Sequence, residues 1–152
     1  MNWPDDMIGI ILAVVFGAAI GLEREISGKA AGLRTNVLIC LGAAVFTIIS
    51  KEMAAGLENS PTRIAAQIVT GVGFLGAGAI IRDRGGIHGL TTAATIWLVA
   101  SIGTACGAGF YTLAVVSTLI AIIILIGLAK LEKPLRRYNE KHKSENSPHE
   151  QD

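Results

Sequence analysis

Long uncharged apolar runs, separated by short charged segments, divide the chain into five parts. Between Arg63 and Arg82 lie 18 uncharged residues, which is close to the roughly 20 that a helix needs to cross the hydrocarbon of a bilayer. The uncharged stretch 85–129 is too long for one crossing, and the glycine-rich segment 107–109 divides it. The pattern predicts an all-α membrane protein with five transmembrane helices. The expected spans are about 7–22, 36–50, 64–81, 90–106 and 111–129; they form one domain, 1–130, and are followed by a polar tail, 131–152, that is partly disordered.

Composition supports the membrane class. Charged residues make up 16% of the chain, whereas a soluble domain carries about 25%. Cys40 and Cys106 both lie inside apolar runs, which favours buried structural thiols over a disulfide framework. The N-terminal segment 1–6 has no basic residue, so the first run is expected to stay as a helix and not to be cleaved as a signal peptide.

The distribution of basic residues predicts the orientation. With five spans and the N-terminus outside, eleven Lys and Arg residues fall on the cytoplasmic side and two, Lys51 and Arg63, fall on the outer side. This asymmetry follows the positive-inside rule. We therefore expect the N-terminus outside and the C-terminus in the cytoplasm.

Small residues recur at helical spacing in the apolar runs, where they let helix backbones approach closely. Gly71, Gly73 and Gly76 also form a literal G-x-G-x-x-G. That motif binds a dinucleotide only after a strand in a soluble unit, and here it lies in the middle of a predicted span. The glycines assigned to helix packing are Gly17, Gly21, Gly71, Gly73, Gly76 and Gly78.

Polar residues near and inside the predicted spans are the candidates for function, because polar groups in hydrocarbon cost free energy unless they are paired. Charged and polar residues near the cytoplasmic boundary are named here the functional polar cluster. Its members are Glu23, Arg24, Glu25, Arg34, Thr35 and Asp83. The intramembrane polar candidates are Asn36, Arg63, Gln67, Thr70, Thr91 and Thr92.

Four motifs in order resemble the MgtC/SapB family of bacterial inner-membrane proteins. They are the segments 21–25 (GLERE), 32–35 (GLRT), 63–78, which begins Arg-x-x-Ala-Gln and ends GFLGAG, and 89–97, which begins GLTTAA and ends in Trp97. The resemblance implies a five-helix membrane domain, in agreement with the count above. Some members carry an additional soluble C-terminal domain, and we expect this chain to be a short form without it.

The resemblance also implies a function linked to growth at low magnesium and to survival of pathogens in macrophages, and hence to virulence. Family members are described either as magnesium transport proteins or as modulators of other membrane proteins, including ATP synthase. The expected partners are therefore the lipid bilayer, a second copy in a homo-oligomer, and another membrane protein such as ATP synthase; nucleic acid is not expected.

Three functions compete. The first is a regulator that recognises another membrane protein through its small-residue faces and polar cluster. The second is a transporter or channel for magnesium or another small ion. Magnesium prefers oxygen ligands, and Glu23, Glu25 and Asp83 each have an arginine beside them. The third is an enzyme, supported only by Asp83 and His88, so we expect no enzymatic activity. The sequence shows no evident cofactor. Magnesium is the one candidate, and the residues that would bind it are unknown.

Overall fold

The computed structural model describes residues 3–54, 63–83 and 86–145, with the side chains of 63–65, 83 and 131–145 excepted. Five helices and one two-stranded sheet make up this part of the chain. They are α1 (Trp3–Ile26), α2 (Leu33–Ala54), α3 (Arg63–Gly78), β1 (Ile81–Asp83), β2 (Gly86–His88), α4 (Leu90–Ala108) and α5 (Tyr111–Glu145).

The predicted helices are all present, but they differ in length. Among the described residues, four helical segments are long and apolar enough to cross a membrane: α1, α2, α4 and the Tyr111–Lys130 part of α5. Helix α3 has 16 residues, which at the usual rise is about 24 Å, against a hydrocarbon thickness of about 30 Å. A full crossing by α3 therefore stays a prediction, as does the direction of the chain through the membrane.

Two segments differ from the sequence prediction. Residues 81–83 and 86–88, expected to end a span and form a turn, are two short antiparallel strands, called here the hairpin, in which Ile81 pairs with His88 and Arg82 pairs with Ile87. Helix α3 ends at Gly78, so the last three residues of the predicted span 64–81 are not helical, and Ile81 belongs to β1. Helix α5 also continues past its apolar part to Glu145. Disorder was predicted for the last dozen residues, 141–152; residues 141–145 belong to α5 instead, and residues 146–152 lie outside the described residues.

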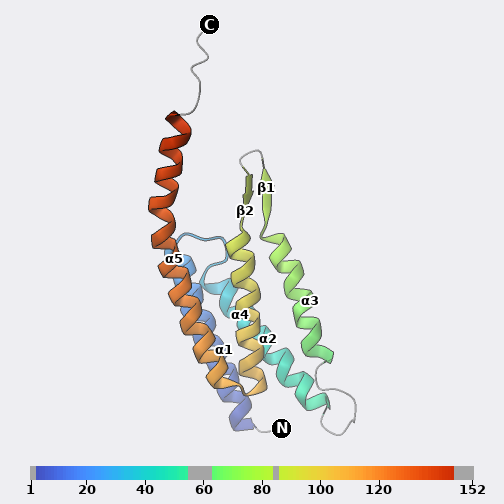
Figure 1. The fold of residues 1–152 in the computed structure, drawn as a ribbon. Helices are drawn as coiled ribbons and strands as arrows, with labels where there is room; N and C mark the ends of the chain where they lie inside the picture. The colour runs from blue at the N-terminus through green and yellow to red at the C-terminus, as the bar shows by residue number, and fades with distance from the viewer. Residues whose placement is uncertain (1–2, 55–62, 84–85, 146–152) are drawn as a thin grey trace.

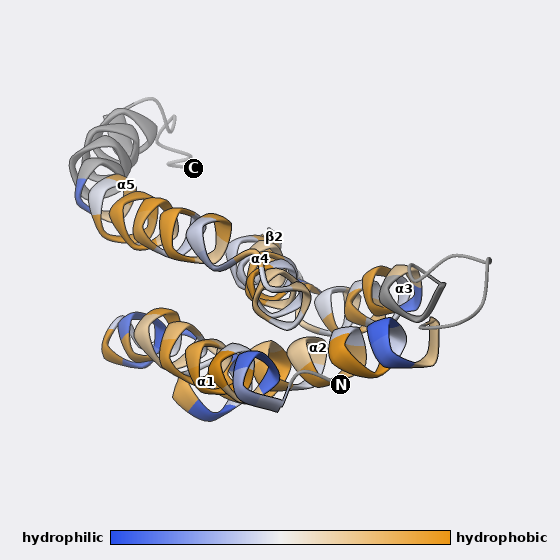
Figure 2. Cartoon of the chain, turned by 90° about the horizontal axis from the view of Figure 1, so that it is seen from below, coloured by the Kyte–Doolittle hydropathy of each residue, from blue (hydrophilic) through white to orange (hydrophobic). Residues whose placement is uncertain are grey.

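The helices form two layers (Figures 1 and 2). Helices α1 and α2 lie side by side in one layer, and α5, α4 and α3 follow one another in the other. Helix α4 is central, because it packs against each of the other four helices. At one end of the bundle, α1 ends, α2 and α4 begin, and the hairpin lies (Figure 1). We call this end the hairpin end. Figure 2 shows that most residues along the helices are apolar, as expected for helices that cross a bilayer.

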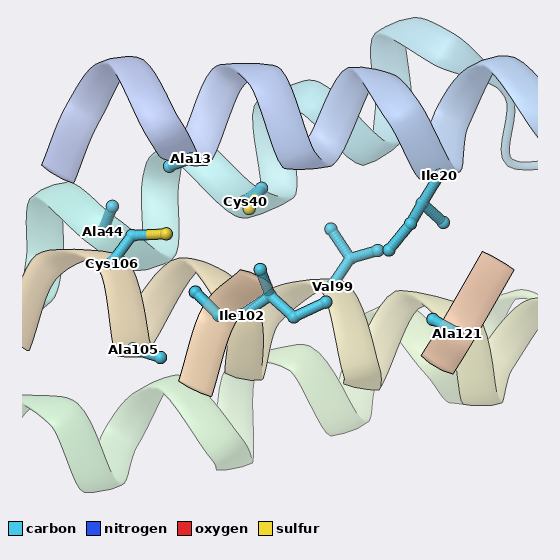
Figure 3. Packing of buried hydrophobic residues seen from close by; sticks show 10 residues of the cluster. Ala13, Ile20, Cys40, Ala44, Val99, Ile102, Ala105, Cys106 and Ala121 are labelled. Atoms are coloured by element: carbon cyan, nitrogen blue, oxygen red, sulfur yellow. The ribbon is translucent and has the colours of Figure 1, made fainter. Parts of the chain in front are cut away.

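Glycines allow helices to approach closely both within a layer and between the two layers. A Cβ added at Gly17 would lie 2.9 Å from the carbonyl oxygen of Asn36, and one added at Gly21 would lie 2.8 Å from Cα of Leu33. Gly103 of α4 meets the backbone of α2 in the same way. Close helix approach of this kind is the main source of packing energy between helices in lipid. The core between the layers consists of small and medium side chains (Figure 3): Ala13, Ile20, Cys40, Ala44, Val99, Ile102, Ala105, Cys106, Ala114 and Ala121.

Several threonine hydroxyl groups in the helices bond to a carbonyl of their own helix. Thr47 donates to the carbonyl of Ala43 at 2.7 Å, and Thr118 donates to that of Ala114 at 2.7 Å. Such bonds to the preceding turn let threonine enter an apolar environment at low cost. A threonine inside these helices is thus not by itself a binding group.

Candidate functional site

The last turn of α1 places three consecutive charged residues in three different environments. Arg24 is buried, with 3% of its surface exposed, whereas Glu25 is exposed. Glu23 is partly buried; its Oε1 accepts a hydrogen bond from the Ser27 hydroxyl at 2.7 Å, and its Oε2 lies 3.8 Å from Nη1 of Arg24. The helix thus turns its basic residue inward and one acidic residue outward.

Glu25 has a structural role at the start of α2. Its Oε2 accepts a hydrogen bond from the backbone N–H of Leu33 at 3.0 Å. This N–H belongs to the first turn of the helix, where backbone donors have no partner within the helix. The carboxylate also lies against Gly32, where a Cβ would collide with it. Glu25 therefore caps α2 and links the ends of the first two helices.

Asn36 lies fully buried one turn into α2. Its Nδ2 donates to the carbonyls of Ala31 and Gly32, both at 2.8 Å. Its Oδ1 is buried and has no hydrogen-bond partner among the described residues. Two other groups at the hairpin end share this property: Oε2 of Glu23, and Nε with Nη2 of Arg24. A natural protein has few such groups, so each calls for an explanation.

The structure brings together only part of the functional polar cluster. Glu23, Arg24 and Glu25 lie in one turn of α1, with Glu25 bound to the start of α2. Arg34 and Thr35 are exposed in the first turn of α2. Asp83 belongs to β1, but its side chain lies outside the described residues, so its place in the cluster stays a prediction.

The intramembrane polar candidates are also dispersed. Asn36 and Thr92 are buried, whereas Gln67, Thr70 and Thr91 are exposed on their helices. Arg63 begins α3, and its side chain lies outside the described residues. These groups do not form one polar path in the described part of the chain.

Gln67 lies at a cavity between α2 and α3. The cavity has a volume of about 610 Å³ and is bounded by apolar side chains and by glycine on both helices. Gln67 is the only residue with a polar side chain in its described lining. The full lining is Leu38, Ile39, Gly42, Ala43, Phe46, Gln67, Ile68, Gly71, Val72 and Leu75.

The outer face of α3 carries a row of small, exposed residues. The inner face packs through Val72 and through Gly76, where an added Cβ would lie 3.8 Å from that of Ala93. On the opposite side, a Cβ at Gly73 would meet no atom within 4 Å, and Phe74 is 81% exposed. The outer row comprises Ala66, Thr70, Gly73 and Ala77, all exposed. Gly71 and Gly78, which were assigned to packing, are equally open, so their packing role stays a prediction.

One ion pair was not anticipated from the sequence. Nζ of Lys51 lies 3.0 Å from Oδ1 of Asp6, and Asp6 is only 4% exposed. The pair joins the start of α1 to the last turns of α2, at the opposite end from the hairpin. The sequence signal was available: an aspartate in the first turn of a span needs a partner, and Lys51 closes the next span.

No group of three or more His, Cys, Asp or Glu side chains comes together in the described residues. The buried oxygens without a hydrogen-bond partner at the hairpin end, on Glu23 and Asn36, share that end with the arginine Arg24. What distinguishes this end is therefore a buried cation with unused hydrogen-bond donors.

The fold and the polar groups define a class: a multi-pass helical membrane protein with a buried charged turn at one end and an open small-residue face on one helix. Comparison with known proteins gives the family. The chain matches the MgtC family over residues 10–134 and belongs to it.

Individual relatives agree with this assignment. The chain is 41% identical over 131 residues to the uncharacterised protein slr0014 of Synechocystis, covering 86% of the chain and 55% of the relative. It is 47% identical over 125 residues to YhiD of Escherichia coli strain K12, which its name describes as a proposed magnesium transporter, covering 78% of the chain and 58% of that protein. It is 45% identical over 134 residues to protein MgtC of Salmonella typhimurium, covering 88% and 55%.

The chain thus spans somewhat more than half the length of these relatives, and the match lies in the helical part described above. No solved structure is significantly similar to it.

Proposed function

We propose that this protein is a regulator in the bacterial response to magnesium limitation, and that it acts by binding another membrane protein along the outer face of α3. The proposal places it in the inner membrane with its N-terminus outside and assigns it no enzymatic activity. The open small-residue row on α3 is the observation that carries it.

The argument compares glycines within one chain. In α1 and α4, Gly9, Gly17, Gly21, Gly103 and Gly107 lie so close to a neighbouring backbone that an added Cβ would collide with it. Glycine in a helix costs about 1 kcal/mol relative to alanine, and at these positions close packing offsets that cost.

Gly73 has the same cost but no neighbour within 4 Å of an added Cβ. The adjacent positions Ala66, Thr70 and Ala77 are small and exposed as well. A row of this kind fits the approach of a further helix, since small residues are enriched where membrane helices associate. A partner helix on this row would also cover Phe74, which is otherwise exposed.

The link to magnesium comes from the relatives. YhiD of E. coli carries magnesium transport in its name, and the family resemblance implies growth at low magnesium. Because the chain covers little more than half of these proteins, we transfer the physiological context and not their complete activity.

The test is growth of a gene-deleted strain at low magnesium, complemented with Gly73→Leu or with Gly127→Leu. Gly127 is a matched control, because it too is an exposed helical glycine with no atom within 4 Å of an added Cβ. We expect Gly73→Leu to lose complementation and to lose crosslinks to a partner in native membranes, at unchanged protein level. Wild-type behaviour of both variants would refute the role of the α3 face.

A magnesium transporter is the second candidate, favoured by the name of the E. coli relative and by the carboxylates at the hairpin end. The test is magnesium flux into liposomes that contain the purified protein. Flux that depends on the protein and is lost in Glu25→Gln would make transport the primary function. Absence of flux from folded protein would favour regulation.

A further inference from the structure

The cavity between α2 and α3 is open on one side. Its volume of about 610 Å³ lies within the range of about 300–1,000 Å³ that is usual for ligand pockets. Several of its lining side chains are exposed: Leu38 by 67%, Phe46 by 56% and Leu75 by 48%. Because α2 is long and apolar enough to cross a membrane, the open side of the cavity faces hydrocarbon. Whatever fills the cavity therefore reaches it from within the bilayer.

Two glycines give the cavity its width. Gly42 of α2 and Gly71 of α3 both line it, and a Cβ added at either would meet no atom within 4 Å. A glycine inside a helix costs about 1 kcal/mol relative to alanine. At Gly17 and Gly103 close packing offsets this cost, because an added Cβ would collide with a neighbouring helix. At Gly42 and Gly71 no such contact exists within the described residues, so the space that they leave calls for an occupant.

The side chains beside these glycines determine how thick the occupant is. Each glycine lies between two longer side chains in its own row. The rows, at intervals of four residues, are Leu38, Gly42 and Phe46 on α2, and Gln67, Gly71 and Leu75 on α3. Close approach of a helix needs small residues repeated along a row, and the long side chains here hold a helix backbone away. A single hydrocarbon chain is thin enough to pass between them.

The lining also contains one polar group. Gln67 is exposed, and it is the only polar side chain in the described lining. It lies four residues, or about 6 Å, from the start of α3 at Arg63. An amide in hydrocarbon needs a hydrogen-bond partner, and the amide of glutamine can donate two hydrogen bonds. The matching ligand is an amphiphile, with a long apolar chain and a hydrogen-bond acceptor near one end.

The neutral amide favours an ester as that acceptor over a carboxylate. A carboxylate in hydrocarbon needs a cationic partner, and the described lining of the cavity contains no cationic side chain. An ester carbonyl is uncharged and accepts a hydrogen bond from a neutral donor. The acyl chains of phospholipids carry such a carbonyl where the hydrocarbon meets the headgroups. The uncharged run of α3 begins at the corresponding level, directly after Arg63.

We propose that one acyl chain of a membrane phospholipid occupies this cavity, with its ester carbonyl accepting a hydrogen bond from Nε2 of Gln67. The chain fills the space left by Gly42 and Gly71 and so completes the packing of α3 against α2. Gly73 follows Gly71 by two residues, which is about 200° around the helix axis. The lipid site is therefore on the opposite side of α3 from the partner face, and it is independent of the proposed regulatory function.

The test uses the purified full chain, stripped of lipid in mild detergent, and native mass spectrometry with three probes. They are dioleoyl-phosphatidylglycerol, its ether analogue, which lacks the ester carbonyls, and oleic acid. Wild type is compared with Gln67→Leu and with Gly71→Leu and Gly42→Leu, which fill the cavity from either wall. Gly127→Leu is the matched control, because Gly127 is an exposed helical glycine with no atom within 4 Å of an added Cβ, but on α5. In liposomes, phosphatidylglycerol with a diazirine in its acyl chain locates the contact.

We expect wild type and Gly127→Leu to retain the ester lipid and to bind the ether analogue about three- to tenfold more weakly, the effect of one hydrogen bond. Gly71→Leu and Gly42→Leu should each bind the ester lipid at least about tenfold more weakly, because leucine takes the space of the chain. Gln67→Leu should bind the ester and ether lipids equally, since it keeps an apolar lining without the donor. The diazirine should label segments 38–46 and 67–75 of the wild type.

Unchanged binding of the ester lipid by both Gly71→Leu and Gly42→Leu would overturn the proposal, as would diazirine labels that avoid both segments. Equal binding of the ester and ether lipids by wild type would overturn the hydrogen bond to Gln67. Tighter binding of oleic acid than of the phospholipid would overturn the phospholipid as the ligand. If the leucine variants at both glycines do not fold, the ester and ether lipids, compared on wild type and on Gln67→Leu, decide. Gly73→Leu should keep the lipid, so this site and the partner face fail or succeed separately.

Discussion

Replacing Gly17 with alanine tests whether close contact between backbones holds α1 against α2. The added Cβ would lie 2.9 Å from the Asn36 carbonyl oxygen, 2.9 Å from Cβ of Cys40 and 3.0 Å from Cα of Val37. All three atoms belong to α2 and none is the free end of a flexible side chain. The new methyl group can therefore be accommodated only if the two helices move apart.

The expected cost follows from that movement. To bring these contacts to an ordinary separation, the helices must part by about 0.5 Å, a gap at which each atom pair loses about a quarter of its dispersion energy. Over about 20 pairs along the seam, at about 0.05 kcal/mol each, the loss is about 1 kcal/mol. Strain in the neighbouring backbone adds to it, so overpacking should cost about 1–3 kcal/mol.

Alanine also gains helix propensity over glycine, which opposes this cost by up to about 1 kcal/mol. Gly73→Ala separates the two terms, because its Cβ meets nothing within 4 Å and only the propensity gain remains. The difference in free energy of unfolding between Gly17→Ala and Gly73→Ala should then be about 1–3 kcal/mol, with Gly17→Ala the less stable. Unfolding by SDS titration, followed by circular dichroism in mixed micelles, measures it. Equal stabilities of the two variants would show that the α1–α2 seam is looser than the structure indicates.

Three further predictions concern other contacts. Lys51→Met should destabilise the protein by about 1–2 kcal/mol because it leaves the buried Asp6 carboxylate unpaired. Adding Asp6→Asn should recover part of the lost free energy of unfolding in a double-mutant cycle. Strict additivity of the two changes would contradict the pairing. Glu25→Ala should lower the free energy of unfolding by about 1 kcal/mol, because it removes the carboxylate that caps the Leu33 N–H. Glu25→Gln keeps an acceptor, so it should lower that free energy by less in the same SDS titration. We also expect a homo-oligomer, so the mass in lipid nanodiscs should be a multiple of 15.9 kDa; a strictly monomeric mass would contradict this.

The sequence predicted the helices well, because uncharged runs bounded by charge leave few alternatives in a membrane. The division between α4 and α5 was also visible: Gly109 adopts a left-handed conformation with φ of 87°, which favours glycine. The hairpin at 81–88 was not predictable by the same means. Three-residue strands carry no periodicity, and Ile81 reads equally well as the end of a span.

The polar site was less predictable, for a reason of helix geometry. A row of small residues at intervals of four, ending at Gly21, extends by the same interval to Glu25. A helix has 3.6 residues per turn, so such a row drifts around the axis by about 40° at each step. After four steps the buried face has passed to Arg24, which follows Ile20 by four residues and Gly17 by seven. Tracking the face in steps of three and four would have identified Arg24 as the inward residue.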